Sequence, residues 1–115
     1  MNNKLLIKRI DSRAVLPSKN REDVGYDIYA IIDEEIVVLP PNTGKLFRTG
    51  LVVAFPEDYG MFVCNRSGVG SKGLVYGAHV IDSGYRGEVF INLHNISKKI
   101  VIIADMGGAN LVEEE

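Results

Sequence analysis

The sequence predicts an all-β fold, a β-sandwich or jelly roll of short strands. Short runs rich in β-branched and aromatic residues recur along the chain, as is typical of strands. Turn residues separate these runs, and the 115 residues include 12 glycines and 4 prolines. No stretch repeats apolar residues at spacings of three and four over several turns, so no long helix is expected. Many short strands joined by frequent turns are the pattern of a sandwich or jelly roll.

The first half of the chain carries four predicted strands. They cover residues 4–10, 26–32, 35–39 and 45–55. A polar loop from Asp11 to Asp23 separates the first two. The third strand closes at the turn Pro40-Pro41-Asn42-Thr43-Gly44, and Gly50 interrupts the fourth.

The second half carries three more predicted strands, at residues 60–65, 88–95 and 98–104. In the middle one, Val89, Ile91 and Leu93 lie on one face and Phe90, Asn92 and His94 on the other, which predicts a strand with two different faces. Residues 106–110 are expected to be flexible, and the final glutamates at 113–115 to form a solvated acidic end.

Length, charge and cysteine content set the class of protein. A chain of 115 residues is one domain, 1–115, in which 105–115 are expected to be a flexible or divergent tail. The net charge of -2 argues against direct nucleic-acid binding. Cys64 is the only cysteine, so an intrachain disulfide is excluded and an intracellular, cytoplasmic setting is expected. The sequence shows neither a signal-peptide core nor an apolar run of membrane-spanning length, so no membrane partner is expected.

A glycine-rich stretch, residues 65–88, carries the candidate site. Arg66 and Ser67 precede Gly68 in a loop that could present a cation, a hydroxyl and backbone N–H groups to phosphate. Asp82 follows two apolar residues and precedes Ser-Gly, which predicts that its carboxylate emerges at a strand end. Tyr85 supplies a flat ring near that end. A phosphate cradle, a carboxylate and a stacking ring together indicate a nucleotide site.

Each of these residues also has a purely structural interpretation. Arg66 alone could be a surface charge, Asp82 a turn cap and Tyr85 part of the core. The match of residues 68–73 to G-x-G-x-x-G indicates neither a dinucleotide site nor a kinase. No helix is expected after it, and the chain lacks a kinase catalytic loop.

The remaining reactive side chains carry no site. Cys64 lies in the apolar run Met61-Phe62-Val63-Cys64 and is expected to be a buried small hydrophobe. Neither His79 nor His94 has the spacing to an acidic residue that makes a metal site.

Three ordered segments resemble the motifs of the homotrimeric dUTPase family. Residues 23–30, DVGYDIYA, resemble the first motif, and Arg66-Ser67-Gly68 with Lys72-Gly73 resembles the second. Residues 81–88, IDSGYRGE, resemble the third, which is the most specific. The resemblance runs from about residue 4 to residue 95 and implies a dUTPase-like distorted jelly roll.

The resemblance implies an enzyme, a dUTP diphosphatase that hydrolyses dUTP to dUMP and pyrophosphate. Asp82 would be the catalytic residue, as the general base for the attacking water. Arg66, Ser67 and the Gly68 amide would hold phosphate oxygens and developing charge. Tyr85 would lie against the deoxyribose and leave no room for a 2′-hydroxyl.

The same resemblance implies the rest of the site. The backbone of Ala78, His79, Val80 and Ile81 would read the uracil edge. Asp27 would brace the phosphate side. Mg2+ would bridge the phosphates mostly through water, with no protein ligand of its own. The sites would lie between subunits of a homotrimer, so Asp82 and Arg66 of one site would come from different chains.

The sequence also departs from the family pattern. Asn65 stands where a proline is usual, and the hairpin before Asp82 is shorter than in most members. Residues 105–110 only echo the fourth motif, G-D-[RK]-I-A-Q, and the fifth, a glycine-rich arm that closes over the phosphates, is not found. The chain is shorter than is usual in the family, as a truncated, frameshifted or divergent member would be.

Two other functions stay open. The protein could be a catalytically impaired dUTPase-like protein that binds nucleotide or regulates a partner. It could, less favourably, be a dCTP deaminase, which shares the fold. That family has a catalytic glutamate where this chain has Asn92, and an amide cannot take up and release the proton that deamination requires.

Overall fold

The computed structural model describes residues 5–64, 73–77, 80–105 and 109–114. Within them it contains nine strands and no helix, which confirms the all-β prediction. The strands are β1 (Leu6–Arg9), β2 (Ile36–Leu39), β3 (Thr43–Ala54), β4 (Met61–Phe62), β5 (Leu74–Gly77), β6 (Val80–Ile81), β7 (Glu88–Asn95), β8 (Ile100–Asp105) and β9 (Ala109–Glu114). None of the described segments forms a helix long and apolar enough to cross a membrane.

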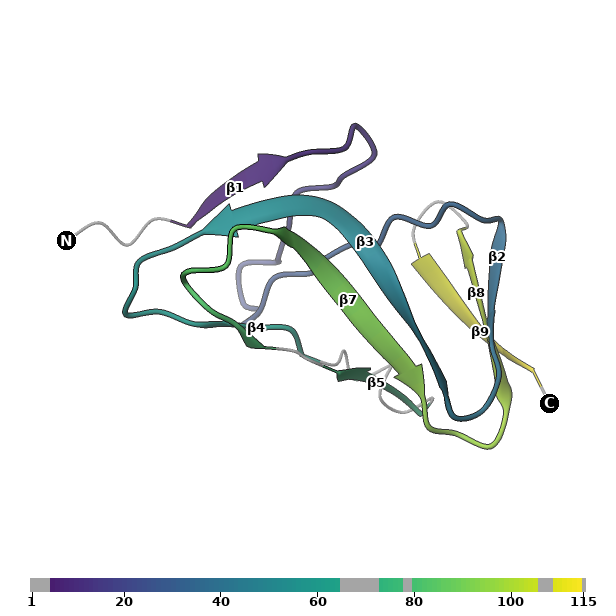
Figure 1. Ribbon diagram of the computed structural model, residues 1–115. Helices are drawn as coiled ribbons and strands as arrows, with labels where there is room; N and C mark the ends of the chain where they lie inside the picture. The colour runs from purple at the N-terminus through teal and green to yellow at the C-terminus, as the bar shows by residue number, and fades with distance from the viewer. Residues whose placement is uncertain (1–4, 65–72, 78–79, 106–108, 115) are drawn as a thin grey trace.

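Two sheets pack into the sandwich, and a short ribbon completes it. The larger sheet has the order β1-β3-β7-β5, and the second has the order β2-β8-β9. Figure 1 shows β3 and β7 running side by side along the larger sheet, with β2, β8 and β9 beside one end of that pair. Strands β4 and β6 form a separate two-stranded ribbon.

The core lies between the two sheets. It is made of inward-facing apolar residues, Phe47, Leu74, Ile91 and Leu93 from the larger sheet and Val37, Leu39, Val101 and Ile103 from the second. Along β7 the burial alternates residue by residue, as the sequence predicts for a strand with one face in the core. Burial of such side chains supplies the main driving force for closing the two sheets.

A bulge interrupts β3 at Gly50, where the sequence predicts a break. The pairing of β3 with β7 shifts register between Arg48 and Val52. Gly50 has a φ of 68°, which only glycine adopts readily. A Cβ at this position would also lie 2.8 Å from the Cβ of Ala14, so the bulge requires glycine for space as well.

Two predicted segments have a different structure. Residues 26–32 are not a strand; they make only isolated bridges, Ser18 with Asp27 and Ile31 with Arg48. Strand β1 pairs with β3 only from Leu51 to Ala54, and residues 26–32 reach β3 only through the bridge of Ile31 with Arg48. The glycine-rich stretch contains a strand that the sequence analysis did not predict, because β5 pairs with β7 from Leu74 to Gly77.

A further strand, β9, lies within residues 105–115, the segment that the sequence predicts to be a flexible or divergent tail. Strand β9 pairs antiparallel with β8 from Asp105 opposite Ala109 to Ile100 opposite Glu114. The acidic composition of the segment gives no sign of a strand. The strand forms because the edge of β8 away from β2 supplies its backbone hydrogen-bond partners. Cys64 is exposed, so the expectation of a buried thiol is wrong.

Candidate functional site

The predicted catalytic carboxylate lies at the surface directly after β6. Ile81, the last residue of that strand, is buried in a cluster with Val53 and Val89. Asp82 follows it and is exposed, as predicted for a carboxylate at a strand end. The backbone N–H of Tyr85 donates to the carbonyl of Asp82 at 3.1 Å, which closes a turn. The buried neighbour and the closed turn therefore hold Asp82 at a defined place on the surface.

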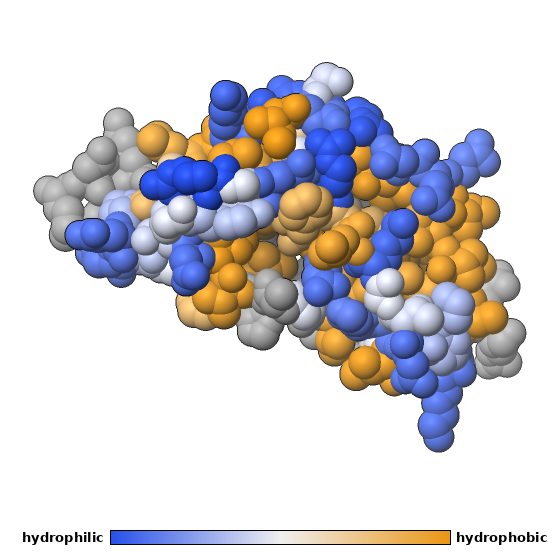
Figure 2. All heavy atoms as spheres, in the orientation of Figure 1, coloured by the Kyte–Doolittle hydropathy of each residue, from blue (hydrophilic) through white to orange (hydrophobic). Residues whose placement is uncertain are grey.

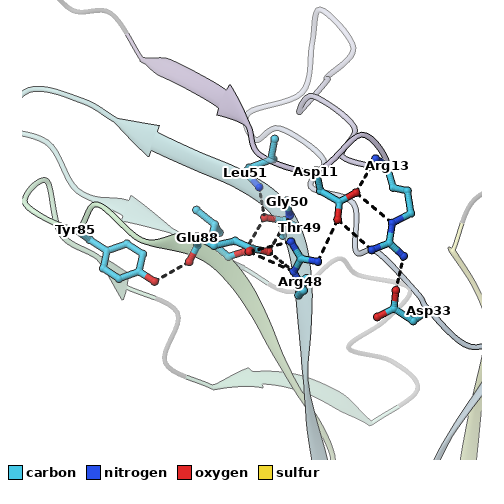
Figure 3. A network of polar contacts seen from close by, with 10 residues as sticks. Asp11, Arg13, Asp33, Arg48, Thr49, Gly50, Leu51, Tyr85 and Glu88 are labelled. Carbon is cyan, nitrogen blue, oxygen red and sulfur yellow. Dashed lines mark hydrogen bonds and ion pairs between the residues drawn. The ribbon is translucent and has the colours of Figure 1, made fainter.

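Tyr85 is no part of the core. Its side chain is 42% exposed, and its hydroxyl donates to the carbonyl of Glu88 at 2.6 Å. This bond folds the ring back over the segment that leads into β7 (Figure 3). The turn 82–85 and the start of β7 thus present a carboxylate and an aromatic ring in one short loop.

Glu88 joins this loop to the bulge in β3. Arg48 donates to its carboxylate from Nε at 3.0 Å and from Nη2 at 3.3 Å, and the Gly50 N–H donates to it at 3.0 Å. The Glu88 side chain is only 12% exposed. The bulge turns the Gly50 amide toward this carboxylate, so the break in β3 creates part of the network in Figure 3.

The network continues away from the loop. Arg48 also donates to Asp11 at 3.1 Å, and Arg13 pairs with both Asp11 and Asp33. Hydrogen bonds from the side chain and backbone of Arg13 hold the pKa of Asp11 well below its usual range, and Arg48 lowers it further. The pKa of Arg48 is raised, chiefly because Glu88 accepts its hydrogen bonds.

Sequence reasoning did not find this network. Arg48 was not singled out, and Glu88 entered only as the last residue of a motif. The two residues lie 40 positions apart, and nothing local to either one signals the other. Only the register of β3 against β7 brings them together.

The other predicted site residues are divided between described and undescribed parts of the chain. Val80 is exposed on β6 opposite Phe62, and Ile81 is buried opposite Met61. Asp27 is half-buried in a separate segment, where its N–H donates to the Ser18 carbonyl at 2.7 Å. The remaining predicted residues, Arg66, Ser67, Gly68, Ala78 and His79, lie outside the described residues.

An apolar groove of about 730 Å3 lies beside the ribbon of β4. Aromatic and aliphatic side chains from three separate segments line it, including Ile7, Val24, Tyr26, Tyr59 and Phe62. Apolar side chains also gather in the view of Figure 2 over β2 and β8, where Ile36, Val38 and Ile100 are exposed. Exposed apolar surface of this kind is typical of protein interfaces.

The described part of the chain contains no group of three or more His, Cys, Asp or Glu side chains that could hold a metal ion. Magnesium prefers oxygen ligands and keeps several waters, so phosphate oxygens can supply what a protein cage does not.

Comparison with known proteins identifies relatives along most of the chain. The family model of the dUTPases matches residues 11–107. The chain is 38% identical over 111 residues to the deoxyuridine 5′-triphosphate nucleotidohydrolase of Mycobacterium marinum, a match that covers 93% of this chain and 70% of that protein. The protein of the same name from Leptospira interrogans is 35% identical over 104 residues, which cover 87% of this chain and 71% of that protein.

Solved structures agree with the sequence comparison. The dUTPase from phage phi11 of S. aureus superposes with a TM-score of 0.72 at 37% identity, over 83% of this chain and 61% of that one. The dUTPase of Staphylococcus bacteriophage 80alpha gives a TM-score of 0.70 at 38% identity, over 83% and 61% of the two chains. Another structure of the phi11 enzyme, a mutant, reveals the coordination of a structural Mg(II) ion. The matched part therefore spans about 70% of the bacterial relatives and about three fifths of the phage chains.

Proposed function

This chain belongs to the dUTPase family, and from that membership we propose that it hydrolyses dUTP to dUMP and pyrophosphate. The observation that carries the proposal is the loop after β6. It presents an exposed carboxylate, Asp82, and an exposed ring, Tyr85, within one closed turn that buried Ile81 anchors. A carboxylate can act as the general base for an attacking water, and an aromatic ring can lie against the sugar of a nucleotide.

Asp82 is the general base of the proposed reaction. Its carboxylate accepts a proton from the attacking water, which then attacks a phosphorus atom and releases pyrophosphate. Arg66, Ser67 and the Gly68 amide hold the phosphate oxygens and stabilise the developing charge, and Asp27 braces the phosphate side. Magnesium would be held by phosphate oxygens and water, and would supply positive charge to the polyphosphate.

Recognition of the nucleoside falls to the segment that leads into Asp82. Strand β6 belongs to a two-stranded ribbon, so its backbone has one edge with no strand partner among the described residues. Such an edge can form hydrogen bonds to the uracil, and Ala78, His79, Val80 and Ile81 are the proposed contacts. Tyr85 lies against the deoxyribose and excludes a 2′-hydroxyl.

The proposed assembly is a homotrimer, with Asp82 and Arg66 of each site from different chains. The groove lined by Tyr26 and Phe62 and the exposed apolar face of β2 and β8 support association. The proposal includes no direct nucleic-acid contact, which suits a net charge of -2. A cytoplasmic location is part of the proposal and rests on the single cysteine.

A pyrophosphate-release assay with dUTP and magnesium tests this function. We expect release with dUTP, and little with UTP or dCTP. Chelation of magnesium should reduce turnover. Ammonia release from dCTP would instead indicate the deaminase, which the amide of Asn92 argues against. No pyrophosphate from dUTP at any magnesium concentration would contradict the proposal.

A second candidate is regulation of a partner protein. The study of the 80alpha structure states that phage dUTPases control transfer of virulence genes by a proto-oncogenic G protein-like mechanism. The similarity of this chain to that protein favours a role as a nucleotide-dependent regulator. Calorimetry with a non-hydrolysable dUTP analogue that shows binding, beside an assay that shows no turnover, would support this candidate over the enzyme.

A further inference from the structure

The ring of Tyr85 lies where a side chain at Gly87 would be. A Cβ built on Gly87 would lie 2.6 Å from the Tyr85 hydroxyl oxygen and 2.8 Å from Cζ. These distances are too short for any real contact, so the ring occupies the space that the glycine leaves open. Gly84 belongs to the same loop, but a Cβ there would meet nothing within 4 Å. The loop therefore needs glycine at position 87 for the ring and has no such need at position 84.

A hydrogen bond holds the other end of the ring. The Tyr85 hydroxyl donates to the Glu88 carbonyl at 2.6 Å, a short bond for two oxygen atoms. The acceptor itself has a fixed position, because the Glu88 side chain accepts hydrogen bonds from Arg48 and from the Gly50 amide. Figure 3 shows this series from Tyr85 through Glu88 to Arg48 and on to Asp11. The ring of an exposed tyrosine is thus tied to the bulge of β3.

We propose that Gly87 and the anchored Glu88 carbonyl position the Tyr85 ring, and that this position sets the preference of the site for 2′-deoxyribose over ribose. The inference rests on the proposed function, in which Tyr85 lies against the sugar. Exclusion of a hydroxyl group by a ring is a matter of van der Waals distance. A ring that shifts outward admits the larger sugar and loses contact with the smaller one. Gly87 and Glu88 are positioning residues, since both act through Tyr85.

Gly87→Ala is the main test. The new methyl group meets the far end of a half-exposed side chain, so the ring moves while the backbone keeps its conformation. We expect the ratio of kcat/KM for UTP to that for dUTP to rise about tenfold or more, the scale of a displaced contact in a binding pocket. The matched control, Gly84→Ala, adds the same methyl group to the same loop and should leave this ratio unchanged.

Tyr85→Phe is the second variant. It removes the hydrogen bond to Glu88 and keeps the ring, with no change to the backbone. We expect a smaller rise in the same ratio. If Gly87→Ala fails to fold, the ratio measured for Tyr85→Phe tests the positioning role by itself. An NMR measurement on protein labelled with fluorotyrosine adds a readout of the ring itself: the Tyr85 resonance should shift in Gly87→Ala and stay in place in Gly84→Ala.

The possible results distinguish a failure of the positioning role from a failure of the proposed function. If the parent discriminates against UTP and neither Gly87→Ala nor Tyr85→Phe changes the ratio, the positioning role is wrong and the function stands. An equal rise in Gly84→Ala also overturns it, because any change in the loop would then suffice. If the parent binds non-hydrolysable dUTP without turnover, the affinity ratio of the dUTP and UTP analogues replaces kcat/KM. If the parent binds neither analogue, the function fails and the inference with it.

Discussion

At the scale of single residues, Asp82 and Tyr85 differ in how far their surroundings fix the position of the side chain. Asp82 is exposed, and its backbone carbonyl accepts the hydrogen bond that closes the turn. The side chain of Tyr85 is held at its hydroxyl, and its ring lies in the space that a Cβ at Gly87 would fill. A carboxylate that stays accessible can reach a water and a substrate, whereas a held ring can shape the space around a sugar. The two side chains suit the separate roles of proton acceptor and steric guide.

Asp82→Asn should abolish most turnover and leave the fold intact. The amide is nearly isosteric with the carboxylate but cannot accept a proton, and a general base contributes about 10²–10⁴-fold in rate. We expect an unchanged melting temperature and unchanged affinity for a non-hydrolysable dUTP analogue. If Asp82 were only a turn cap, the variant would melt at a lower temperature and keep its activity per folded molecule. Pyrophosphate release and thermal melting together distinguish the two roles.

Asp11 should make the stability of the protein depend on pH. Its pKa is lowered in the folded state, so the folded protein favours the charged form. That stabilisation is present above the ordinary carboxylate pKa of about 4 and is lost as the pH falls through the lower folded value. Asp11→Asn should therefore lower the melting temperature at pH 7, and the difference from the parent should shrink below about pH 4. Asp58→Asn, in an exposed turn, serves as the control and should change little at either pH.

At the scale of elements, the connections between strands decide how the sheets meet. The turn from β7 to β8 depends on Asn95, which is completely buried. Its amide donates to the carbonyls of Leu39 and Lys99, each at 2.8 Å, and its oxygen accepts from the Ser97 N–H at 2.9 Å. One side chain thus links the end of β2 in the second sheet to the end of β7 in the first.

Asn95→Ala should destabilise the protein without a direct effect on the loop that holds Asp82. The substitution leaves the Leu39 carbonyl without its donor, and an unsatisfied buried polar group costs about 1–3 kcal/mol. Urea denaturation should show a lower free energy of unfolding by about this amount. Asn20→Ala, on an exposed turn, should stay within about 0.5 kcal/mol of the parent. A loss no greater than that of the control would show that Asn95 is not the link inferred from its bonds.

At the scale of the whole molecule, one protomer leaves much apolar surface exposed. The groove beside β4 and the outer face of β2 and β8 are separate apolar areas on a small domain. Small domains bury a limited fraction of their surface and gain stability from association. A symmetric oligomer would cover such areas and would bring residues of neighbouring chains together.

The protein should be a trimer in solution. Light scattering after size-exclusion chromatography at micromolar concentration should give about three times the protomer mass of 12.7 kDa. Dilution should reduce activity together with mass, because the proposed site draws Asp82 and Arg66 from different chains. A monomer that retains full turnover would contradict both the trimer and the shared site.

The sequence alone determined those features of the structure that depend on residues adjacent in the chain. Alternation along residues 88–95 predicts β7 with its buried and exposed faces, because a strand turns successive side chains to opposite sides. Gly50 marks the interruption of β3, since its backbone conformation is one that glycine adopts at little cost. The order Ile81-Asp82-Ser83-Gly84 places a carboxylate at the end of a short strand.

Only the tertiary structure decided those features that depend on which strands pair with each other. Residues 26–32 have the composition of a strand but lack a continuous partner, whereas the acidic segment 109–114 finds one in β8. The exposure of Cys64 likewise follows from its surroundings and not from its apolar neighbours in sequence. Arg48 and Glu88 meet across 40 residues because the register of β3 against β7 and the bulge at Gly50 set them side by side. Pairing between distant segments depends on how the strands assemble into sheets, and the residues next to Arg48 or Glu88 do not identify the partner.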